Sequence, residues 1–211
     1  MGDWTTVSED DVLLVVDVQN DFCPGGSLAV PAGNDIVPAI NGLMRRFPHV
    51  VLTQDWHPEG HSSFASVHPG TEPLQTVEVD YGTQILWPDH CVQGTLGAAF
   101  HRDLEINRAE LIIRKGFRPA VDSYSAFYEN DRRTGTGLTG YLRERGFKRI
   151  FACGIATDVC VRWSVLDGRR EGFEVALIEN ASAAIDHDGS LAAAMSDMRE
   201  AGVEVLPNVP H

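Results

Sequence analysis

The sequence predicts a three-layer α/β/α domain with a mostly parallel central sheet. Short runs of apolar, β-branched residues, typical of fully buried strands, alternate along the chain with segments that place apolar residues at helical spacing. Glycine directly follows three successive predicted helices, at Gly146, Gly172 and Gly202, where a left-handed residue commonly ends a helix. Strands that alternate with helices imply right-handed crossovers, which cover a parallel sheet on both faces.

The first half of the chain supplies three strands and one helix. An apolar run closed by an acid predicts a buried strand over Asp11–Asp17. Apolar residues at helical spacing predict a helix over Ile36–Phe47, with Pro38 in its first turn, where proline is tolerated. Further apolar runs predict strands over His49–Thr53 and Leu111–Arg114.

The second half of the chain alternates helix and strand three times. The predicted helices are Thr136–Arg145, Asp158–Glu171 and Asp188–Glu200. The predicted strands are Arg149–Cys153, Phe173–Ile178 and Val203–Leu206. Each helix is followed by its glycine and then by a strand, so these segments are expected to form successive crossover units of one sheet.

One segment, Trp56–Arg108, separates the second and third strands without a clear long helix. A loop of that length inside a compact domain is usually functional. It holds most of the Trp- and His-rich sequence of the chain, including the run Trp87-Pro88-Asp89-His90-Cys91. We therefore predict a single domain over residues 1–211, with an inserted functional segment at about 56–109.

Composition and charge exclude several classes of protein. Of the 211 residues, 43% are hydrophobic and 22% charged, which is enough apolar material for a buried core. The net charge of -13 repels phosphate backbones and argues against nucleic-acid binding. No apolar run approaches the roughly 20 residues of a membrane span, and the acidic N-terminus does not resemble a secretory signal. Four cysteines without a CxxC pair fit a reducing cytoplasm, which is the expected location.

Reactive side chains follow four of the predicted strands. They are Asp17 and Asp55 after the first two strands, Lys115 after the third, and the segment Cys153–Cys160 after the fourth. Ligands of open α/β sheets bind outside the carboxyl ends of the strands. Strand ends are exposed and often polar, so any one of these residues alone is explained equally well without a function. Two carboxylates, an ammonium and a thiol together indicate an active site.

The thiol of Cys160 is the predicted nucleophile. The chain runs there from a strand into a helix, with Thr157 as the candidate N-cap and Cys160 in the first helical turn, where the macrodipole favours a thiolate. Lys115 would favour the thiolate further, and Asp17 is placed to take the proton. Cys153, within an apolar strand, reads as core packing. This combination suggests covalent acyl transfer, with backbone N–H groups at the helix start as an oxyanion hole.

A metal site is the second candidate feature. Asp55 and His57 are two residues apart, so they project to the same side of an extended chain. A third ligand must come from elsewhere, and His90 and His61 are the candidates. Two histidines and one carboxylate suit zinc, iron(II) or manganese, and the same set describes the iron oxygenase triad.

Five motifs carry a resemblance to a known family. They are residues 16–22 (VDVQNDF), 53–58 (TQDWHP), 87–95 (WPDHCVQGT), 115–116 (KG) and 154–161 (GIATDVCV). Together they resemble the nicotinamidase/pyrazinamidase branch of the isochorismatase-like cysteine hydrolases. The resemblance runs from the first strand through the last helix. The Asp-x-His and Trp-Pro-x-His-Cys motifs are its narrowest part, because many relatives lack the metal.

The resemblance implies a role for each of these residues. A catalytic triad is formed by Asp17, Lys115 and Cys160. One divalent ion (zinc, iron or manganese) is held by Asp55, His57 and His90, and either His61 or a nearby serine completes the shell. The oxyanion hole consists of the N–H groups of Ala156 and Cys160, after a cis peptide bond before Ala156. The substrate pocket includes Phe22, Trp87, Tyr124 and Ile155.

The activity implied by the resemblance is hydrolysis of nicotinamide to nicotinate and ammonia through a cysteine thioester, in NAD salvage, with pyrazinamide as a further substrate. The inserted segment at about 56–109 then binds metal and substrate. The expected partner is this small molecule, with no nucleic acid and no membrane, and a homo-oligomer is left open. Three alternatives remain: a sister amidase for an acyclic amide or ureido substrate, a non-catalytic binding module, and an iron(II) oxygenase.

Overall fold

The computed structural model describes residues 4–209 and contains one six-stranded sheet in which all paired strands are parallel. The strands lie in the order β5-β2-β1-β6-β7-β8. Their bounds are β1 Asp11–Val16, β2 His49–Asp55, β5 Leu111–Lys115, β6 Arg149–Ile155, β7 Glu174–Ala183 and β8 Glu204–Leu206. The predicted three-layer α/β fold is confirmed.

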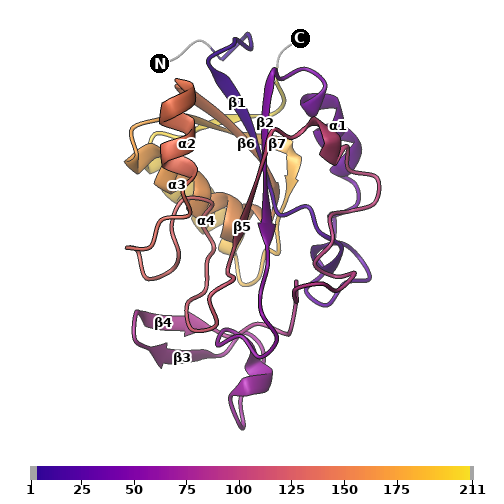
Figure 1. Ribbon diagram of the computed structural model, residues 1–211, viewed down its shortest axis with the longest axis vertical. Coiled ribbons are helices and arrows are strands. Elements are labelled where there is room, and N and C mark those ends of the chain that lie inside the picture. The colour runs from indigo at the N-terminus through magenta and orange to yellow at the C-terminus, as the bar shows by residue number, and fades with distance from the viewer. Residues whose placement is uncertain (1–3, 210–211) are drawn as a thin grey trace.

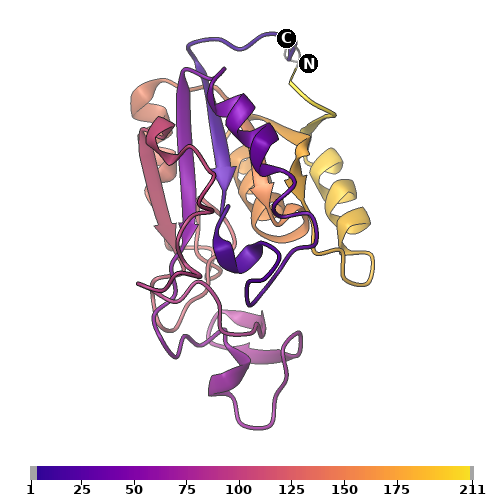
Figure 2. The ribbon, with the colours of Figure 1, turned by 90° about the vertical axis from the view of Figure 1, so that its right-hand side faces the viewer.

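Helices cover both faces of this sheet (Figures 1 and 2). Their bounds are α1 Val37–Met44, α2 Leu138–Arg145, α3 Arg162–Arg170 and α4 Ser190–Glu200. Alternate residues of β1 serve two cores, because successive side chains of a strand point to opposite faces. Leu13 and Val15 pack with the apolar side of α1. Val12, Leu14 and Val16 pack with α2, α3 and α4 on the opposite face.

The strand order places the carboxyl ends of β1, β2, β5 and β6 next to one another. The chain leaves β1 toward β2 and β5 on one side and returns to β6, β7 and β8 on the other. The order therefore reverses between β1 and β6, where α/β sheets of this kind bind their ligands. In the register of the sheet Asp55 of β2 stands opposite Lys115 of β5.

Several boundaries differ from those predicted. The helix expected over 158–171 begins as a π turn over Thr157–Val161 and continues as α3. The strand expected over 173–178 extends to Ala183, past a register shift in its pairing with β6. The three glycines after the helices do adopt left-handed conformations, at φ 79° for Gly146, 89° for Gly172 and 77° for Gly202.

The segment between β2 and β5 contains no α-helix. It forms the two-stranded antiparallel hairpin β3 Thr76–Val79 and β4 Gly82–Ile85, and the short 3-10 turns 65–67 and 106–108. The hairpin lies beyond the carboxyl edge of the main sheet, at the bottom of Figure 1. Among residues 4–209, no helix is both long and apolar enough to cross a membrane.

Candidate active site

Asp17, Lys115 and Cys160 meet at the carboxyl edge of the sheet. Lys115 Nζ lies 2.8 Å from Asp17 Oδ2 and 3.6 Å from Cys160 Sγ. Asp17 follows β1 with a φ of 48°, and Lys115 is the last residue of β5. All three side chains are buried, Lys115 at 1% exposure. Burying an ammonium costs desolvation free energy, which neighbouring carboxylates must offset. Asp17 and Asp55 therefore make the buried position of Lys115 possible.

Burial determines the proton affinity of Asp17. Thr53 Oγ1 donates to Asp17 Oδ1 at 2.6 Å, and Asp17 N donates to the same hydroxyl at 3.1 Å. Burial raises the pKa of Asp17, and the ammonium of Lys115 opposes this only in part, so the pKa stays above that of an ordinary aspartate. A carboxylate with a raised pKa is a better proton acceptor, as a general base requires.

The thiolate expected at Cys160 is not favoured in this structure. Burial raises the pKa of the thiol well above its usual value, although Lys115 opposes the shift. The expectation rested on the helix start and on Lys115, and the burial of Cys160 against the core behind β6 outweighs both. Cys160 is therefore a thiol at rest. Lys115 stays charged, because Asp17 and Asp55 outweigh burial and hold the pKa of Lys115 well above normal.

The chain turns sharply where β6 enters the π turn. The Ile155–Ala156 peptide is cis, as expected, and Ala156 has extended dihedral angles. Ala156, and not Thr157, occupies the cap position, because Thr157 is already helical. The carbonyl of Ala156 accepts from the N–H groups of Val159 and Val161 at 3.1 and 3.0 Å. Cys160 thus lies in the first helical turn, while its oxyanion role and that of Ala156 stay predictions.

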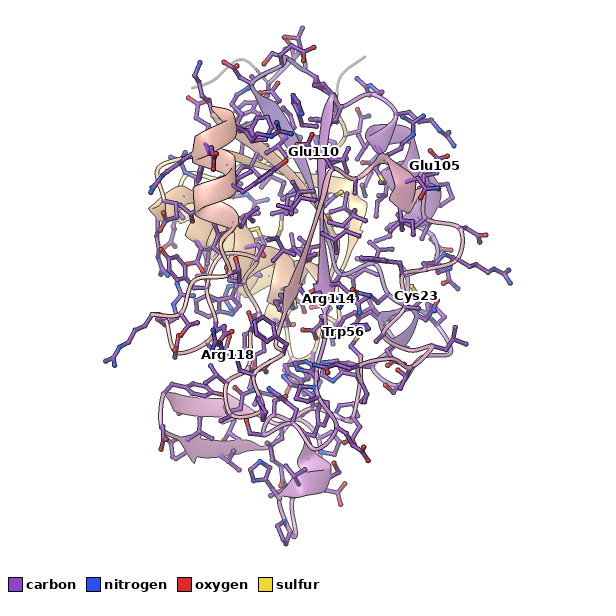
Figure 3. The ribbon with its side chains drawn as sticks, viewed as in Figure 1. Cys23, Trp56, Glu105, Glu110, Arg114 and Arg118 are labelled. Carbon is purple, nitrogen blue, oxygen red and sulfur yellow. The ribbon has the colours of Figure 1, made fainter. Side chains whose placement is uncertain are left out.

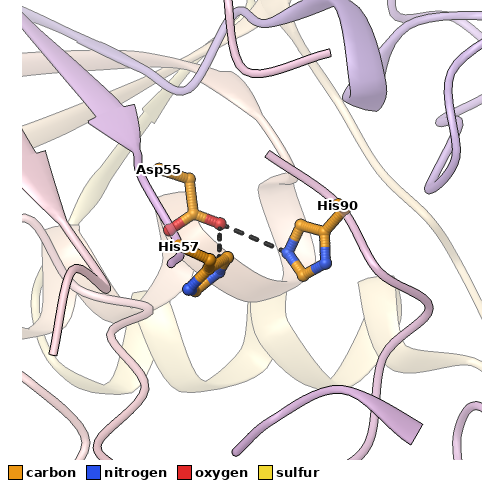
Figure 4. Close-up of side chains that lie close together, drawn as sticks. All are labelled: Asp55, His57 and His90. Atoms are coloured by element: carbon orange, nitrogen blue, oxygen red, sulfur yellow. Dashed lines mark ion pairs between the residues drawn. The ribbon is translucent and has the colours of Figure 1, made fainter. Parts of the chain in front are cut away.

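Asp55, His57 and His90 converge on one point beside this cluster (Figure 4). His57 Nε2 lies 2.9 Å and His90 Nε2 3.3 Å from Asp55 Oδ2. Burial opposes ionisation, but His57 and Lys115 hold the pKa of Asp55 well below its usual range. All three side chains are buried. A carboxylate and two imidazoles in this arrangement match the ligands of zinc, iron(II) or manganese.

Backbone carbonyls fix both imidazoles for metal binding. His57 Nδ1 donates to Gly116 O at 2.9 Å, and His90 Nδ1 donates to Pro88 O at 2.8 Å. Each ring thereby turns Nε2 toward Asp55, the usual outer-shell arrangement for a histidine ligand. His57 Nε2 is buried without a hydrogen-bond partner among the described residues. The donor set therefore fits a divalent cation.

Gly116 makes room for these ligands. A Cβ on Gly116 would lie 2.5 Å from His57 Cε1 and 3.0 Å from Asp55 Oδ1. Its φ of 66° is also one that glycine adopts readily. The Lys-Gly pair at residues 115–116 thus supplies a charged side chain to one cluster and space to the other.

His61 is engaged elsewhere. Its Nε2 donates to the carbonyl of Arg118 at 2.8 Å, and its Nδ1 lies 2.7 Å from Ser63 Oγ. Burial and the neighbouring His57 lower the pKa of His61, so it packs as a neutral ring beside the ligands. Of the two candidates for the third ligand, the structure brings His90 to Asp55.

A pocket adjoins both clusters and is lined by aromatic residues from the inserted segment and from two other parts of the chain. Its lining includes three of the predicted substrate residues, Phe22, Trp87 and Tyr124. The fourth, Ile155, is fully buried in the core at the end of β6 and does not line the pocket. Four lining residues had not been predicted: Leu28, Asp122, Val159 and Ile185. Asp122 lies two residues before Tyr124 in the sequence. This proximity is the one sequence signal that could have placed Asp122 in the pocket.

Trp56, the middle residue of the Asp-Trp-His motif, lies outside this pocket. Its ring stacks at 4.0 Å against the guanidinium of Arg114 on edge strand β5 (Figure 3). The two flanking residues of the motif, Asp55 and His57, point to the opposite side of the extended chain and are themselves members of the metal-ligand set.

The chain matches the family model of the isochorismatase domain over residues 11–208. It is 52% identical over 192 residues to a nicotinamidase of Acinetobacter baylyi, covering 91% of this chain and 90% of the relative. A solved nicotinamidase/pyrazinamidase of Acinetobacter baumannii is 54% identical, with a TM-score of 0.93, and the match covers 94% of this chain and 96% of that one.

Two further solved structures contain relevant ligands. PnC1 from L. infantum, in complex with nicotinate, is 42% identical with a TM-score of 0.83, over 95% of this chain and 94% of that one. A pyrazinamidase of Pyrococcus horikoshii, in complex with zinc, is 37% identical with a TM-score of 0.76, over 93% of this chain and 98% of that one. From the family match and these identities, the chain belongs to the isochorismatase family.

Proposed function

We propose that this chain is a nicotinamidase, an amidohydrolase that converts nicotinamide to nicotinate and ammonia. One observation carries the proposal: Lys115 joins the acid and the thiol of a hydrolytic site, and the same lysine lies 3.0 Å from Asp55 of the metal-ligand set. Relatives at 52% and 54% identity bear the name nicotinamidase. The nicotinate complex of the L. infantum relative supports an aromatic carboxylate as the product.

In the proposed mechanism Asp17 accepts the thiol proton as Cys160 Sγ attacks the carboxamide carbon. The C–N bond breaks, and Asp17 returns the proton to the leaving nitrogen, which departs as ammonia. Asp17 then takes a proton from water as the water oxygen attacks the thioester carbon. The C–S bond breaks, Asp17 returns the proton to Cys160 Sγ, and nicotinate is released. Lys115 stays charged throughout and holds the carboxylate and the sulfur together. The N–H groups of Ala156 and Cys160 stabilise the oxyanion of each tetrahedral intermediate.

We infer that Asp55, His57 and His90 hold a divalent ion, and the zinc complex of the P. horikoshii relative makes zinc the first candidate. When bound, the ion supplies coordination positions for water and for the pyridine nitrogen. Phe22 and Trp87 lie on the pocket wall and would enclose the ring, which directs the carboxamide toward Cys160. Acyclic and ureido substrates have no ring nitrogen to bind the ion, so the metal-ligand set favours a nicotinamidase over a sister amidase for such substrates.

The proposal extends to pyrazinamide, because pyrazine offers a ring nitrogen in the same position relative to the carboxamide.

A cytoplasmic location is supported by the four cysteines, which are all buried free thiols: Cys23, Cys91, Cys153 and Cys160. Thiols persist in reducing compartments.

The direct test of the proposed function measures ammonia and nicotinate released from nicotinamide, with the metal content determined on the same sample. We expect both products in equal amounts at an ordinary enzymatic rate, on the order of 1–10³ per second. Benzamide, which lacks the ring nitrogen, is the matched substrate control and should react much more slowly. A metal-loaded protein with an alkylatable Cys160 and no products from nicotinamide would instead identify a sister amidase.

Replacing His57 by alanine should remove the bound metal and raise KM, because two of three ligands cannot hold the ion or orient the ring. The triad is untouched, so iodoacetamide should still modify Cys160. Metal analysis and steady-state kinetics of His57→Ala check this result. His187→Ala, a matched change of an exposed histidine that belongs to neither group of candidate metal ligands among the described residues, should keep its metal. Unchanged metal content in His57→Ala would show that the ligand assignment is wrong.

A further inference from the structure

The hairpin β3–β4 carries one buried polar side chain. Its second strand has exposed residues at Gly82, Thr83 and Ile85, whereas Gln84 is 1% exposed. A two-stranded hairpin is marginally stable by itself, so it needs contacts with the rest of the domain. A buried amide must also satisfy its hydrogen bonds, since an unpaired one costs free energy. The hydrogen bonds of Gln84 therefore show which side chains of the domain the hairpin positions.

Both ends of the Gln84 amide are bonded. Its Nε2 lies 2.9 Å from Asp122 Oδ2, 3.0 Å from Tyr124 Oη and 2.6 Å from the carbonyl of Ile85. Its Oε1 accepts from Tyr81 Oη at 2.9 Å and from Asn130 Nδ2 at 3.4 Å. Two of these partners, Asp122 and Tyr124, line the pocket that contains Cys160.

The same network fixes the aromatic wall of the pocket. Trp87 Nε1 donates to Tyr124 Oη at 3.2 Å, so the phenol oxygen accepts from both Trp87 and Gln84. The two rings meet edge to face, with centroids 6.1 Å apart. Burial and the charge of Asp122 keep the pKa of Tyr124 well above normal, so it remains a phenol. Its own hydrogen is then left to donate elsewhere, because the oxygen already accepts two hydrogen bonds.

Trp87 and Tyr124 also line a second groove outside the first pocket, together with Leu74, Ile85 and Trp163. The two aromatic side chains are thus the common wall between the inner pocket and an outer, mostly apolar groove. A shift of that wall toward the outer groove would therefore enlarge the inner pocket.

We propose that Gln84 is a positioning residue that sets substrate specificity: its amide holds Asp122, Tyr124 and, through Tyr124, Trp87 at the spacing of an unsubstituted six-membered ring. The inference rests on the proposed nicotinamidase function and deepens it. Gln84 touches neither the nucleophile nor the metal ligands, so its effect is on ring binding.

The test replaces Gln84 by methionine, which keeps the length and bulk of the side chain and removes its hydrogen bonds. We expect KM for nicotinamide to rise about tenfold, the loss of roughly one hydrogen bond, with a smaller change in kcat. The ratio of kcat/KM for nicotinamide to that for 5-methylnicotinamide should fall, because the wall yields to the added methyl group. Metal content and the rate of Cys160 alkylation should match the unmodified protein.

Two further variants complete the design. Gln84→Glu keeps the shape but sets a carboxylate 2.9 Å from Asp122, so it should lose more affinity than Gln84→Met. Gln75→Met is the matched control, because Gln75 is exposed and its side chain, among the described contacts, accepts a hydrogen bond only from the nearby Glu72 N–H. An unchanged KM and an unchanged substrate ratio in Gln84→Met would overturn the proposal. If the unmodified protein does not hydrolyse nicotinamide, nicotinate binding by calorimetry to both proteins still tests Gln84 separately.

Discussion

Cys160→Ala is expected to abolish hydrolysis of nicotinamide while leaving the fold and the metal content intact. Among residues 4–209, Cys160 is the cysteine whose sulfur contacts Lys115 Nζ, at 3.6 Å, and the thioester cannot form without this sulfur. The remaining oxyanion and binding groups give only the small residual rate typical of triad knockouts. Ammonia release, circular dichroism and metal analysis on one preparation check the three parts of this expectation.

The matched control is Cys153→Ala, the same substitution seven residues earlier in β6. Cys153 is fully buried in the core on the α1 face, and burial raises the pKa of its thiol without the opposing ammonium that Lys115 provides at Cys160. It should retain activity and lose only some packing. Full turnover by Cys160→Ala, or its loss in Cys153→Ala without unfolding, would contradict the assignment of the nucleophile.

Asp17→Asn is expected to lower kcat by about 10²–10⁴, the usual contribution of a positioned general base. The amide has the shape of the carboxylate but cannot accept the thiol proton, and burial keeps Cys160 protonated without it. Steady-state kinetics at fixed metal content measure the loss. The alkylation rate of Cys160 should fall as well, because the same proton transfer generates the thiolate.

The pH dependence of kcat/KM tests the role of Asp17 as the base. Because burial raises the pKa of Asp17, the active base form is lost as pH falls through a value above that of an ordinary aspartate. The acid limb of kcat/KM for the native protein should therefore lie at higher pH than an unperturbed carboxylate would give. Asp17→Asn should lack that limb. The same limb in the variant would assign it to another group.

The positions of the proposed catalytic residues in the fold could be predicted from sequence because they depend on simple patterns. Apolar runs mark the positions of β1, β2 and β5. Asp17 follows β1 directly, and Asp55 and Lys115 are the last residues of β2 and β5. Parallel strands align their carboxyl ends, so residues far apart in sequence meet at one edge of the sheet. The observed 2.8 Å contact of Lys115 with Asp17 follows from that geometry.

The proton affinities and the pocket wall could not be predicted in this way. Whether burial or Lys115 dominates the pKa of Asp17 depends on how completely the core encloses it, which spacing does not reveal. Gln84 lies on a short polar hairpin where nothing in the sequence marks it as buried. Ile155 was assigned to the pocket by resemblance, but β6 extends through it and carries its side chain into the core.

In the proposed mechanism Cys160 carries the nicotinoyl group during turnover. The most direct measurement mixes the protein with nicotinamide, quenches with acid within one turnover, and maps the modified peptide by mass spectrometry. We expect a nicotinoyl thioester on Cys160 that appears before nicotinate accumulates, and no such adduct in Cys160→Ala. Rapid formation of nicotinate with an unmodified Cys160 at every quench time would contradict the mechanism.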